Sequence, residues 1–494
     1  MANHINFLLV VAAFGAYYYI QQSLQPTQKT VIVVGGGLAG ASAAIEAHSE
    51  GSRVIILEKE KDLGGNSAKA SSGINGVGSV AQKEKGVEDD VKKFVGDVVE
   101  SGHGLADEQL VQILAEQSAS AIQFLTSHGV NLDVLAQLGG HSSPRTHRPS
   151  PPKDKPPVNV GFAIMRALKE YIADLPEEEA TVIKHAHVTQ LLTDDKNGKK
   201  RVKGVVYKNQ EGNDVEVKGD AVILTTGGYS FNTKMLEKFA PHVAHLSTTN
   251  GDFALGEGID LAAPLSPSLR LMDQVQVHPT CFVDVNDLNS RRRFLAPEAL
   301  RGSGGILLNH KGERFANELG LRDYVTKQIF QQQQEEEGPA TAFLLLSEEA
   351  VEIFQRPNLK FYKFKKLVRE FEGGVREFAE EFNLPVERVI ESIVKYQKQK
   401  EEGQDEFGKK TFPASFNVDS PVHAMVITPC IHYTMGGLQI SKNGEVLDSS
   451  LEPIKGLFAA GEVTGGVHGA NRLAGNSLLE CTVFGRLAGE NASK

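Results

Sequence analysis

The sequence predicts an α/β fold, in which a Rossmann-like domain with a parallel sheet and a small β meander is interrupted by an inserted α+β domain. Three observations predict this class. Residues 31–34 form a β-branched run that leads into glycines and then into a helix-like stretch. Residues 273–433 change to longer, charged helical segments. Residues 456–489 then return to a strand, a glycine-rich loop and a helix.

The first glycine-rich turn has the spacing of a dinucleotide-binding site. Gly35, Gly37 and Gly40 form G-x-G-x-x-G between a strand and a helix, which is the context that this motif requires. Gly35 permits the tight turn, Gly37 lets a pyrophosphate approach the backbone, and Gly40 lets helix and strand pack closely. A second strand ends at Glu58, about where an acid binds the ribose hydroxyls. The whole unit therefore predicts a bound dinucleotide rather than a glycine-rich turn without a ligand.

Two further stretches belong to the same predicted sheet. Residues 181–218 alternate short β segments with polar turns, which predicts a small meander. Residues 221–228, AVILTTGG, are another buried strand that runs into two glycines, and we expect it beside the first strand. Between these motifs and the first turn, residues 107–128 form the clearest amphipathic helical stretch.

Composition and charge exclude several classes of function. The chain has 494 residues, enough for roughly two or three domains. Its net charge of −10 argues against nucleic acid as a partner. The three cysteines, Cys281, Cys430 and Cys481, show no C-x-x-C, haem-attachment or cluster spacing. We therefore expect no iron–sulfur centre, no haem, no disulfide framework and no metal site.

The first 29 residues are predicted to lie outside the fold. Residues 7–20 are apolar or aromatic throughout, a run that is short for a membrane span and suits a signal-like segment or a weak membrane anchor. No Lys or Arg precedes this run, so an Arg-rich presequence is not seen. A disordered tail is the alternative. We expect targeting to the mitochondrion or the endoplasmic reticulum, with weak membrane association through this segment.

Three segments each have two interpretations. The glycine-rich stretch 64–78 is either a flexible linker or a loop that lays N–H groups along a bound ring system. The stretch 139–161 is either a surface connection or an active-site loop, because it concentrates positive charge in an acidic chain. Its basic residues are His141, Arg145, His147 and Arg148. Asp252, near the start of an expected helix at 251–262, either caps that helix or reaches the cofactor.

Motifs spread along the chain resemble one enzyme family. In order, they are GGGLAG, ILEK, GGNSAKASSGIN, TTGG, QVHPT, PEALRG, ERFANE, LRD, IHYTMGG, AAGEVTGGVHGANRL and GNSL. Together they resemble the soluble FAD-dependent fumarate reductases, which belong with succinate dehydrogenase flavoprotein subunits and L-aspartate oxidase. The resemblance implies an FAD-binding domain, residues 30–272 and 434–494, split around a capping (clamp) domain, residues 273–433. The substrate would be held between the two domains.

The resemblance also implies roles for individual residues. Arg322, in LRD, matches the arginine that donates a proton to the substrate, and Glu298 and Arg301, in PEALRG, match its proton-delivery path. The positions that match substrate-binding residues are Ser72, His278, Glu298, His432, Arg472 and Gly475. The positions that match FAD-binding residues are Gly35, Gly37, Ala39, Gly40, Glu58, Asn66, Ser67, Ser72, Gly73, Asp252, Tyr433, Glu462, Ser477 and Leu478.

Two positions bear on how this chain compares with the family. The residue before Glu298 is often a hydroxyl donor to a substrate carboxylate in flavocytochrome members, whereas Pro297 stands here and has no donor. Substrate affinity or choice is therefore expected to differ. Members with covalent flavin carry a histidine around position 66. Because Asn66 stands here, we expect non-covalent FAD.

The reaction implied by the resemblance is reduction of fumarate to succinate, by hydride transfer from flavin N5 and protonation by an arginine. The two arginines and two histidines are all donors suited to a dianion. A diffusible reductant, either reduced flavin or NADH, is expected to supply the electrons, since the chain has no C-x-x-C-H motif. The alternatives are an L-aspartate oxidase, another enoate reductase such as a 3-ketosteroid or urocanate reductase, and a non-enzymatic FAD-binding protein.

Deletion of residues 1–29 is expected to leave fumarate reduction in solution intact and to change the distribution of the protein in cells, because the family motifs begin after this segment. The measurements are turnover by the purified truncated protein and its location in cell fractions. An insoluble, inactive truncation would show that this segment holds part of the core.

Overall fold

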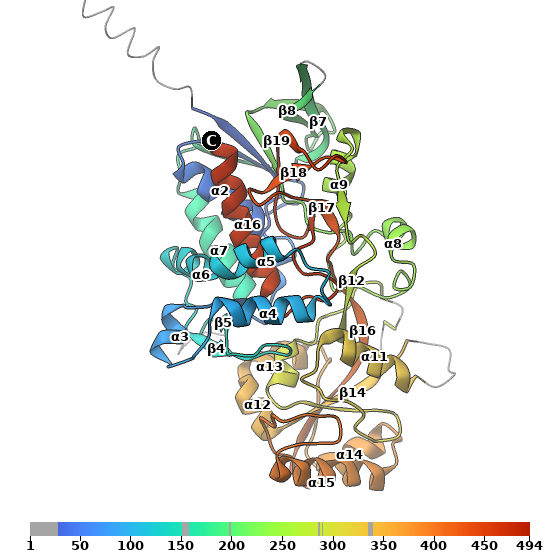
Figure 1. Cartoon of the computed structure of the whole chain (residues 1–494). Helices are drawn as coiled ribbons and strands as arrows, with labels where there is room; N and C mark the ends of the chain where they lie inside the picture. Colours follow the sequence, from blue (N-terminus) through green and yellow to red (C-terminus); the bar gives the residue numbers. More distant parts are fainter. Residues whose placement is uncertain (1–27, 151–157, 197–198, 285–286, 289, 334–338) are drawn as a thin grey trace, which may run out of the picture.

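Two sheets, each with its own helices, make up the fold (Figure 1). The computed structural model describes residues 28–150, 158–196, 199–284, 287–288, 290–333 and 339–494. The apolar N-terminal run lies outside these residues. Within the described ranges, no helix combines the length and the apolar character that crossing a membrane requires.

The first sheet is mainly parallel and holds the dinucleotide motif at its centre. Its main strand order is β6-β2-β1-β10-β19-β8-β7, with β18 against β19 and β9 against β8. The strands are β1 (Thr30–Val34), β2 (Arg53–Glu58), β6 (Ala180–Lys184), β7 (His187–Lys196), β8 (Lys199–Lys208), β9 (Asp214–Lys218), β10 (Ala221–Leu224), β18 (Glu445–Leu447) and β19 (Pro453–Ala459). The predicted return of β10 beside β1 is confirmed, in parallel register. The predicted meander is also confirmed as the antiparallel strands β7, β8 and β9.

Burial explains why β1 occupies the middle of this sheet. Its residues 31–34 are all apolar and almost fully buried, as expected for a strand covered on both faces of a parallel sheet. Helices α2 (Leu38–Ser49), α7 (Val160–Ala173) and α16 (Asn476–Ser493) pack near one another (Figure 1). A Cβ at Gly489 would lie 2.3 Å from the carbonyl oxygen of Ala43. Glycine at this position therefore lets α16 approach the backbone of α2 closely. The last helix of the chain thus packs against the helix of the dinucleotide motif.

The second sheet is antiparallel and is built within residues 275–434. Its order is β12-β16-β14-β13, with β15 against β16. The strands are β12 (Val275–Phe282), β13 (Ile306–Leu308), β14 (Ala342–Ser347), β15 (Arg369–Phe371) and β16 (Val422–Thr434). The helices are α10 (Glu298–Gly302), α11 (Arg322–Gln332), α12 (Glu348–Phe354), α13 (Arg356–Phe364), α14 (Gly374–Glu381) and α15 (Val386–Glu402). The charged helical stretch at residues 348–402 thus consists of the four helices α12 to α15 and strand β15. It is divided because Pro357, Gly374 and Pro385 each lie where a new helix begins.

The remaining elements are shorter helices, two 3₁₀ turns and two small sheets. The helices are α3 (Val80–Glu84), α4 (Val91–Ser101), α5 (Glu108–Glu116), α6 (Ser118–Ser127), α8 (Thr233–Phe239) and α9 (Glu257–Ala262), with 3₁₀ turns at Ser67–Lys69 and Ala263–Leu265. One small sheet has the order β3 (Ile74–Asn75), β5 (Thr146–Arg148) and β4 (Val134–Ala136). The other has the order β11 (Leu269–Arg270), β17 (Gly437–Gln439) and β20 (Thr464–Gly465). The expected amphipathic stretch 107–128 divides into α5 and α6 at Gln117. The expected helix cap at Asp252 is wrong, because α9 begins only after Gly256, whose φ of 77° sets the turn.

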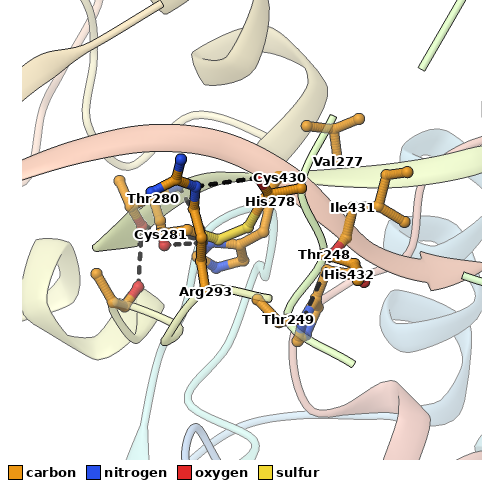
Figure 2. The surroundings of a disulfide bond; sticks show 12 residues. Thr248, Thr249, Val277, His278, Thr280, Cys281, Arg293, Cys430, Ile431 and His432 are labelled. Carbon is orange, nitrogen blue, oxygen red and sulfur yellow. Dashed lines mark hydrogen bonds between the residues drawn. A yellow bond between two sulfur atoms is a disulfide. The ribbon is translucent and has the colours of Figure 1, made fainter. Parts of the chain in front are cut away.

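A disulfide between Cys281 and Cys430 corrects the expectation from cysteine spacing (Figure 2). The two cysteines lie 149 residues apart in the chain, so their spacing carries no signal. The register of β12 against β16 pairs His278 with Cys430 and, after an irregularity, Cys281 with Thr428, so the two cysteines lie near each other on paired strands. The bridge therefore joins the two strands that carry His278 and His432.

The glycine motif gives a matched pair of stability predictions. A Cβ at Gly40 would lie 2.0 Å from the carbonyl oxygen of Gly35, whereas a Cβ at Gly37 would meet only the Ser67 hydroxyl at 3.7 Å. Gly40→Ala is therefore expected to lower the free energy of unfolding by about 1–3 kcal/mol through overpacking. Gly37→Ala, at a helix N-cap with φ of −72°, meets no such clash and should cost less than about 1 kcal/mol, because glycine is only a somewhat better N-cap than alanine.

Urea unfolding of the two FAD-free variants beside the wild type measures the difference. Equal midpoints for Gly40→Ala and wild type would mean that α2 can move away from β1 at no cost, contrary to this packing argument.

Candidate active site

A large cavity runs along the carboxyl ends of the parallel strands. Its lining includes Val34, Glu58, Thr225 and Ala460, which end or directly follow β1, β2, β10 and β19. This is where ligands bind in open α/β sheets. The lining extends from the glycine turn at residues 34–39 to Arg322, His432 and Arg472. The cavity therefore connects the dinucleotide motif with a cluster of basic side chains.

The dinucleotide motif forms one end of the cavity. Gly37 has no side chain to cap helix α2, so, apart from the Leu38 N–H that donates to the Ser67 hydroxyl, its first N–H groups remain available for phosphate oxygens. The Glu58 carboxylate accepts hydrogen bonds from the backbone N–H groups of Gly36 at 2.7 Å and Glu60 at 2.8 Å. Burial raises the pKa of this carboxyl. These features fit the pyrophosphate and the ribose of FAD.

Most of the positions assigned by resemblance line this one cavity. They are Gly35, Gly37, Ala39, Glu58, Asn66, Ser67, Ser72, Gly73, Arg322, His432, Tyr433, Glu462, Arg472, Gly475, Ser477 and Leu478. Five others lie outside the lining: Gly40, Asp252, His278, Glu298 and Arg301. Gly40 acts through packing instead. His278 and Glu298 contact the lining residues His432 and Arg322, and Arg301 lies beyond Glu298. Asp252 is exposed, so the expected contact with FAD has no support in this geometry.

The glycine-rich stretch 64–78 forms a wall of the cavity. Residues 65–67 and 69–73 line it, which favours the interpretation of a loop laid along a bound ring system over that of a flexible linker. The Asn66 side chain is fixed by the backbone N–H of Gly251, which donates to Oδ1 at 3.0 Å. The Ser67 hydroxyl accepts from the N–H of Leu38 at 3.2 Å and so ties this wall to the start of α2.

The far end of the cavity gathers four basic side chains from different elements. Arg322 begins α11, His278 lies in β12, His432 lies in β16, and Arg472 precedes α16. The two imidazole rings lie 5.3 Å apart, edge to face (Figure 2). The Arg472 guanidinium lies 4.5 Å above the ring of Tyr433.

Two side-chain nitrogens at this end have no hydrogen-bond partner among the described residues, and both are donors when Nδ1 of His278 accepts from the N–H of Thr280. They are Nε2 of His278 and Nε of Arg472, and both are buried. Buried polar atoms are nearly always satisfied in folded proteins. An acceptor such as a carboxylate would satisfy them here.

Gln276 links the two arginines and was not predicted. Its side-chain oxygen accepts from Nη1 of Arg322 at 2.7 Å, and its amide nitrogen donates to the carbonyl oxygen of Arg472 at 3.0 Å. Gln276 stands two residues before His278 on β12, so both side chains lie on the same face of the strand. The alternation within QVQVHPT is the signal that could have identified it.

A buried ionic chain leads from the cavity into the second sheet. Nε of Arg322 donates to the Glu298 carboxylate at 2.8 Å, and Arg301 lies 3.7 Å from the same carboxylate. The backbone N–H of Gly139 donates to its other oxygen at 3.0 Å. Burial by itself would raise the pKa of Glu298, but the positive charges of Arg322 and Arg301 outweigh it and hold this pKa below its usual value. Glu298 is therefore an ionised carboxylate between two arginines.

Next to Arg301 lies a second buried acidic residue, Glu318. Arg301 donates to the carbonyl oxygen of Glu318 at 2.5 Å. The Glu318 side chain pairs with Arg314 at 2.9 Å and with Lys409 at 2.7 Å. Arg314 and Glu318 both belong to the ERFANE motif, whose positions received no role from the sequence. Arg314, Glu318 and Lys409 thus form a buried ionic cluster that contacts Arg301 through the Glu318 backbone.

Burial sets the protonation state of the cavity. It lowers the pKa values of His278 and His432 well below the ordinary value, and Arg322 lowers both further. Burial, followed by the charge of Arg322, lowers the pKa of Arg472 to about 10. Burial also raises the pKa of Glu462 to about 7. At neutral pH the histidines are neutral donors and the arginines supply the positive charge.

The basic residues of the stretch 139–161 fit neither of their two interpretations. Arg145 is fully buried and pairs with Asp89 at 2.8 Å and Asp97 at 2.5 Å. His147 is buried against the hydroxyl of Ser79 at 2.7 Å. None of the four basic residues lines the cavity. They belong to the packing around the site, and residues 151–157 lie outside the described ranges.

Comparisons with known proteins cover nearly the whole chain. Residues 30–478 match a family model described as an FAD binding domain. Fumarate reductase 1 of Saccharomyces cerevisiae is 41% identical over 93% of this chain and 98% of that protein. The fumarate reductase of Schizosaccharomyces pombe is 38% identical over 94% of this chain and 89% of that protein. The solved open conformation of a flavocytochrome c3 fumarate reductase is similar with a TM-score of 0.74 and 33% identity, over 97% of this chain and 80% of that chain.

The Glu318 cluster predicts both a loss of stability and a pH dependence. Glu318→Gln leaves buried Lys409 without its carboxylate partner and is expected to cost about 3–5 kcal/mol. Burial raises the pKa of Glu318, but Lys409 and Arg314 outweigh burial and lower it to about 2. The stabilisation is therefore complete above about pH 4.5, the usual pKa of the side chain, and is lost as the pH falls toward 2. The free energy of unfolding of Glu318→Gln should therefore change less than that of the wild type between about pH 4.5 and pH 2.

Chemical denaturation across this pH range tests the prediction. Glu402→Gln is the matched control, because Glu402 pairs with Lys398 at 3.6 Å on the exposed surface of the same sheet's helices. It should cost less than about 1 kcal/mol. Similar decreases in the free energy of unfolding for Glu318→Gln and Glu402→Gln would contradict the argument.

Proposed function

The chain belongs to the FAD binding domain family together with the fumarate reductases that it matches over nearly its full length, and on this premise we propose that it is an FAD-dependent fumarate reductase, forming succinate. The observation that carries the proposal is the far end of the cavity. There Arg322 and Arg472, joined through Gln276, lie beside two neutral histidines.

A dicarboxylate is the substrate that this set of donors fits best. Two buried guanidinium groups can offset two carboxylate charges, and both arginines can bind oxygens through more than one N–H. Nε2 of His278 and Nε of Arg472 offer two further donors that have no other described partner. A substrate with one carboxylate or none, such as a ketosteroid, would leave buried positive charge uncompensated.

FAD would lie along the remainder of the cavity. Gly37 and Ser67 would contact the pyrophosphate, Glu58 the ribose, and Ser477 with Leu478 the flavin. When bound, FAD supplies the hydride that reduces the alkene. We propose that it binds non-covalently, because the side chain at position 66 is an asparagine, which cannot form a histidyl link to the ring.

Arg322 is proposed to donate the proton. It lines the cavity and contacts the Glu298 carboxylate, which also faces Arg301. A guanidinium is a weak acid, so it can serve only if the lost proton is replaced at once. Glu298 and Arg301 form the path along which we propose that this replacement occurs.

The electron source and the compartment are further parts of the proposal. A diffusible reductant, reduced flavin or NADH, would reduce the bound FAD. The apolar run at residues 7–20 would direct the chain to the mitochondrion or the endoplasmic reticulum. Pro297, which precedes α10 with a φ of −57°, offers no donor at a position beside Glu298. We propose that this absence alters affinity for the substrate.

Arg322→Ala is expected to keep FAD and to bind fumarate within about tenfold of the wild type, a difference of about 1.4 kcal/mol. Its kcat should fall by at least about 10³, because general acid catalysis contributes roughly 10²–10⁴ and the relay ends at this side chain. Arg472→Ala should instead show its largest effect on fumarate binding.

Steady-state kinetics and fumarate titration of the oxidised enzyme separate these effects. Turnover near the wild-type rate with only a raised KM in Arg322→Ala would make the proton-donor assignment wrong. Reoxidation of the reduced enzyme by oxygen but not by fumarate would favour an aspartate oxidase and would overturn the proposed function.

Acid precipitation of the purified protein is expected to release all its flavin into the supernatant, since Asn66 cannot form the covalent link. Absorbance of the supernatant and of the washed pellet measures the partition. Yellow colour that stays with the denatured pellet would show a covalent bond at another residue.

A further inference from the structure

Helix α13 carries large apolar side chains on its solvent side. Pro357, Lys360, Phe361, Phe364 and Lys365 recur at i, i+3, i+4, i+7 and i+8 and therefore lie along one stripe. All five are exposed, Phe364 to 80% and Phe361 to 50%. A surface helix ordinarily turns its apolar stripe toward the core. Here Leu359, on the opposite side, supplies the core contact, and the two phenylalanines remain outside.

A second segment extends this apolar surface. Phe294 is 47% exposed, and its ring lies 6.0 Å from the ring of Phe361. The three phenylalanines thus come from two segments far apart in the chain. We call the surface made by Phe294, Phe361, Phe364, Lys360, Lys365 and Lys366 the phenylalanine–lysine patch.

The patch is positive although the chain is acidic. Residues 356–366 contain five cations and no acid, in a protein with a net charge of −10. Arg356 pairs with Glu348 and Glu352, and Lys363 pairs with Glu370. Lys360, Lys365 and Lys366 have no ion pair with a described residue and are all exposed. The exposed stripe therefore keeps its charge, next to the protruding rings.

We propose that the phenylalanine–lysine patch docks on an anionic lipid surface. Aromatic rings enter the boundary between headgroups and acyl chains, while flanking lysines attract the negative headgroups. The rings are exposed on the surface, and none of them lines the described cavity, which fits insertion into a bilayer.

The N-terminal sequence gives an independent reason for a second membrane contact. The apolar run at residues 7–20 is too short to span a bilayer comfortably, and residues 1–27 contain no Lys or Arg. One weak apolar anchor gives marginal, reversible binding, and stable attachment takes a second signal such as a basic patch. The phenylalanine–lysine patch supplies a signal of this kind from the folded part of the chain.

Sedimentation of the full-length protein with vesicles tests the proposal. The vesicles are phosphatidylcholine alone or phosphatidylcholine mixed with phosphatidylserine. Binding is expected to need phosphatidylserine and to weaken with salt. Because residues 1–27 carry no Lys or Arg, this dependence reports the patch. Lys365→Gln with Lys366→Gln should lower the partition coefficient at least about tenfold, and Phe361→Ser with Phe364→Ser by a similar factor.

Val394→Ser and Lys398→Gln on α15 are the matched controls. Val394 is 57% exposed, and neither residue belongs to the patch. Both controls should bind vesicles as the wild type does. All variants should keep fumarate turnover, because none of these side chains lines the cavity.

Equal binding to both kinds of vesicle, or patch variants that bind like the wild type, would overturn the proposal. If the wild type ignores vesicles but is retained on immobilised polyglutamate through the patch, the surface is a contact for an acidic protein and the lipid proposal is wrong.

Discussion

Buried arginine charge is the constraint on which the rest of the site depends. Arg472 is almost fully buried, and no carboxylate among the described residues pairs with it. Removing such a charge from water costs several kcal/mol, and the lowered pKa of its guanidinium, about 10, expresses this cost. A dianionic substrate offsets it. The cavity is therefore complementary in charge to a dicarboxylate before any particular contact is considered.

The two long strands of the second sheet hold that charge in a defined place. β12 contributes Gln276 and His278, and β16 contributes His432, while Arg472 comes from the chain that follows both strands. The disulfide between Cys281 and Cys430 joins the strands beside these residues. Gln276 fixes the spacing between the arginines by bonding to one side chain and to the backbone of the other. The substrate end is thus built on two strands, the start of α11 with Arg322, and the loop that carries Arg472.

Local patterns predicted the first sheet and the glycine turn, because their signals lie within a few residues of one another, and the family resemblance supplied most of the cavity positions. The features that escaped prediction depend on distant partners. Arg145 is neutralised by Asp89 and Asp97 from another segment, and the disulfide joins cysteines 149 residues apart. The helix-cap interpretation of Asp252 was wrong because the positive φ of Gly256 sets a later helix start, and the role of Asp252 in FAD binding stays a prediction. Gln276 was overlooked although its alternation with His278 was visible in the sequence.

The protonation states of the cavity support the proposal that an arginine donates the proton. Glu298 is held ionised by two arginines and has no proton to give. Both histidines are neutral because burial and Arg322 lower their pKa values, and a neutral imidazole is a poor acid. Burial raises the pKa of Tyr433 well above its usual value, and its hydroxyl already donates to Glu480. Of the two arginines, Arg472 donates to a backbone carbonyl, whereas Arg322 contacts the one carboxylate that continues to Arg301. Among these groups Arg322 combines a place in the cavity lining with a route by which its proton can be replaced, and on that ground we propose it as the donor.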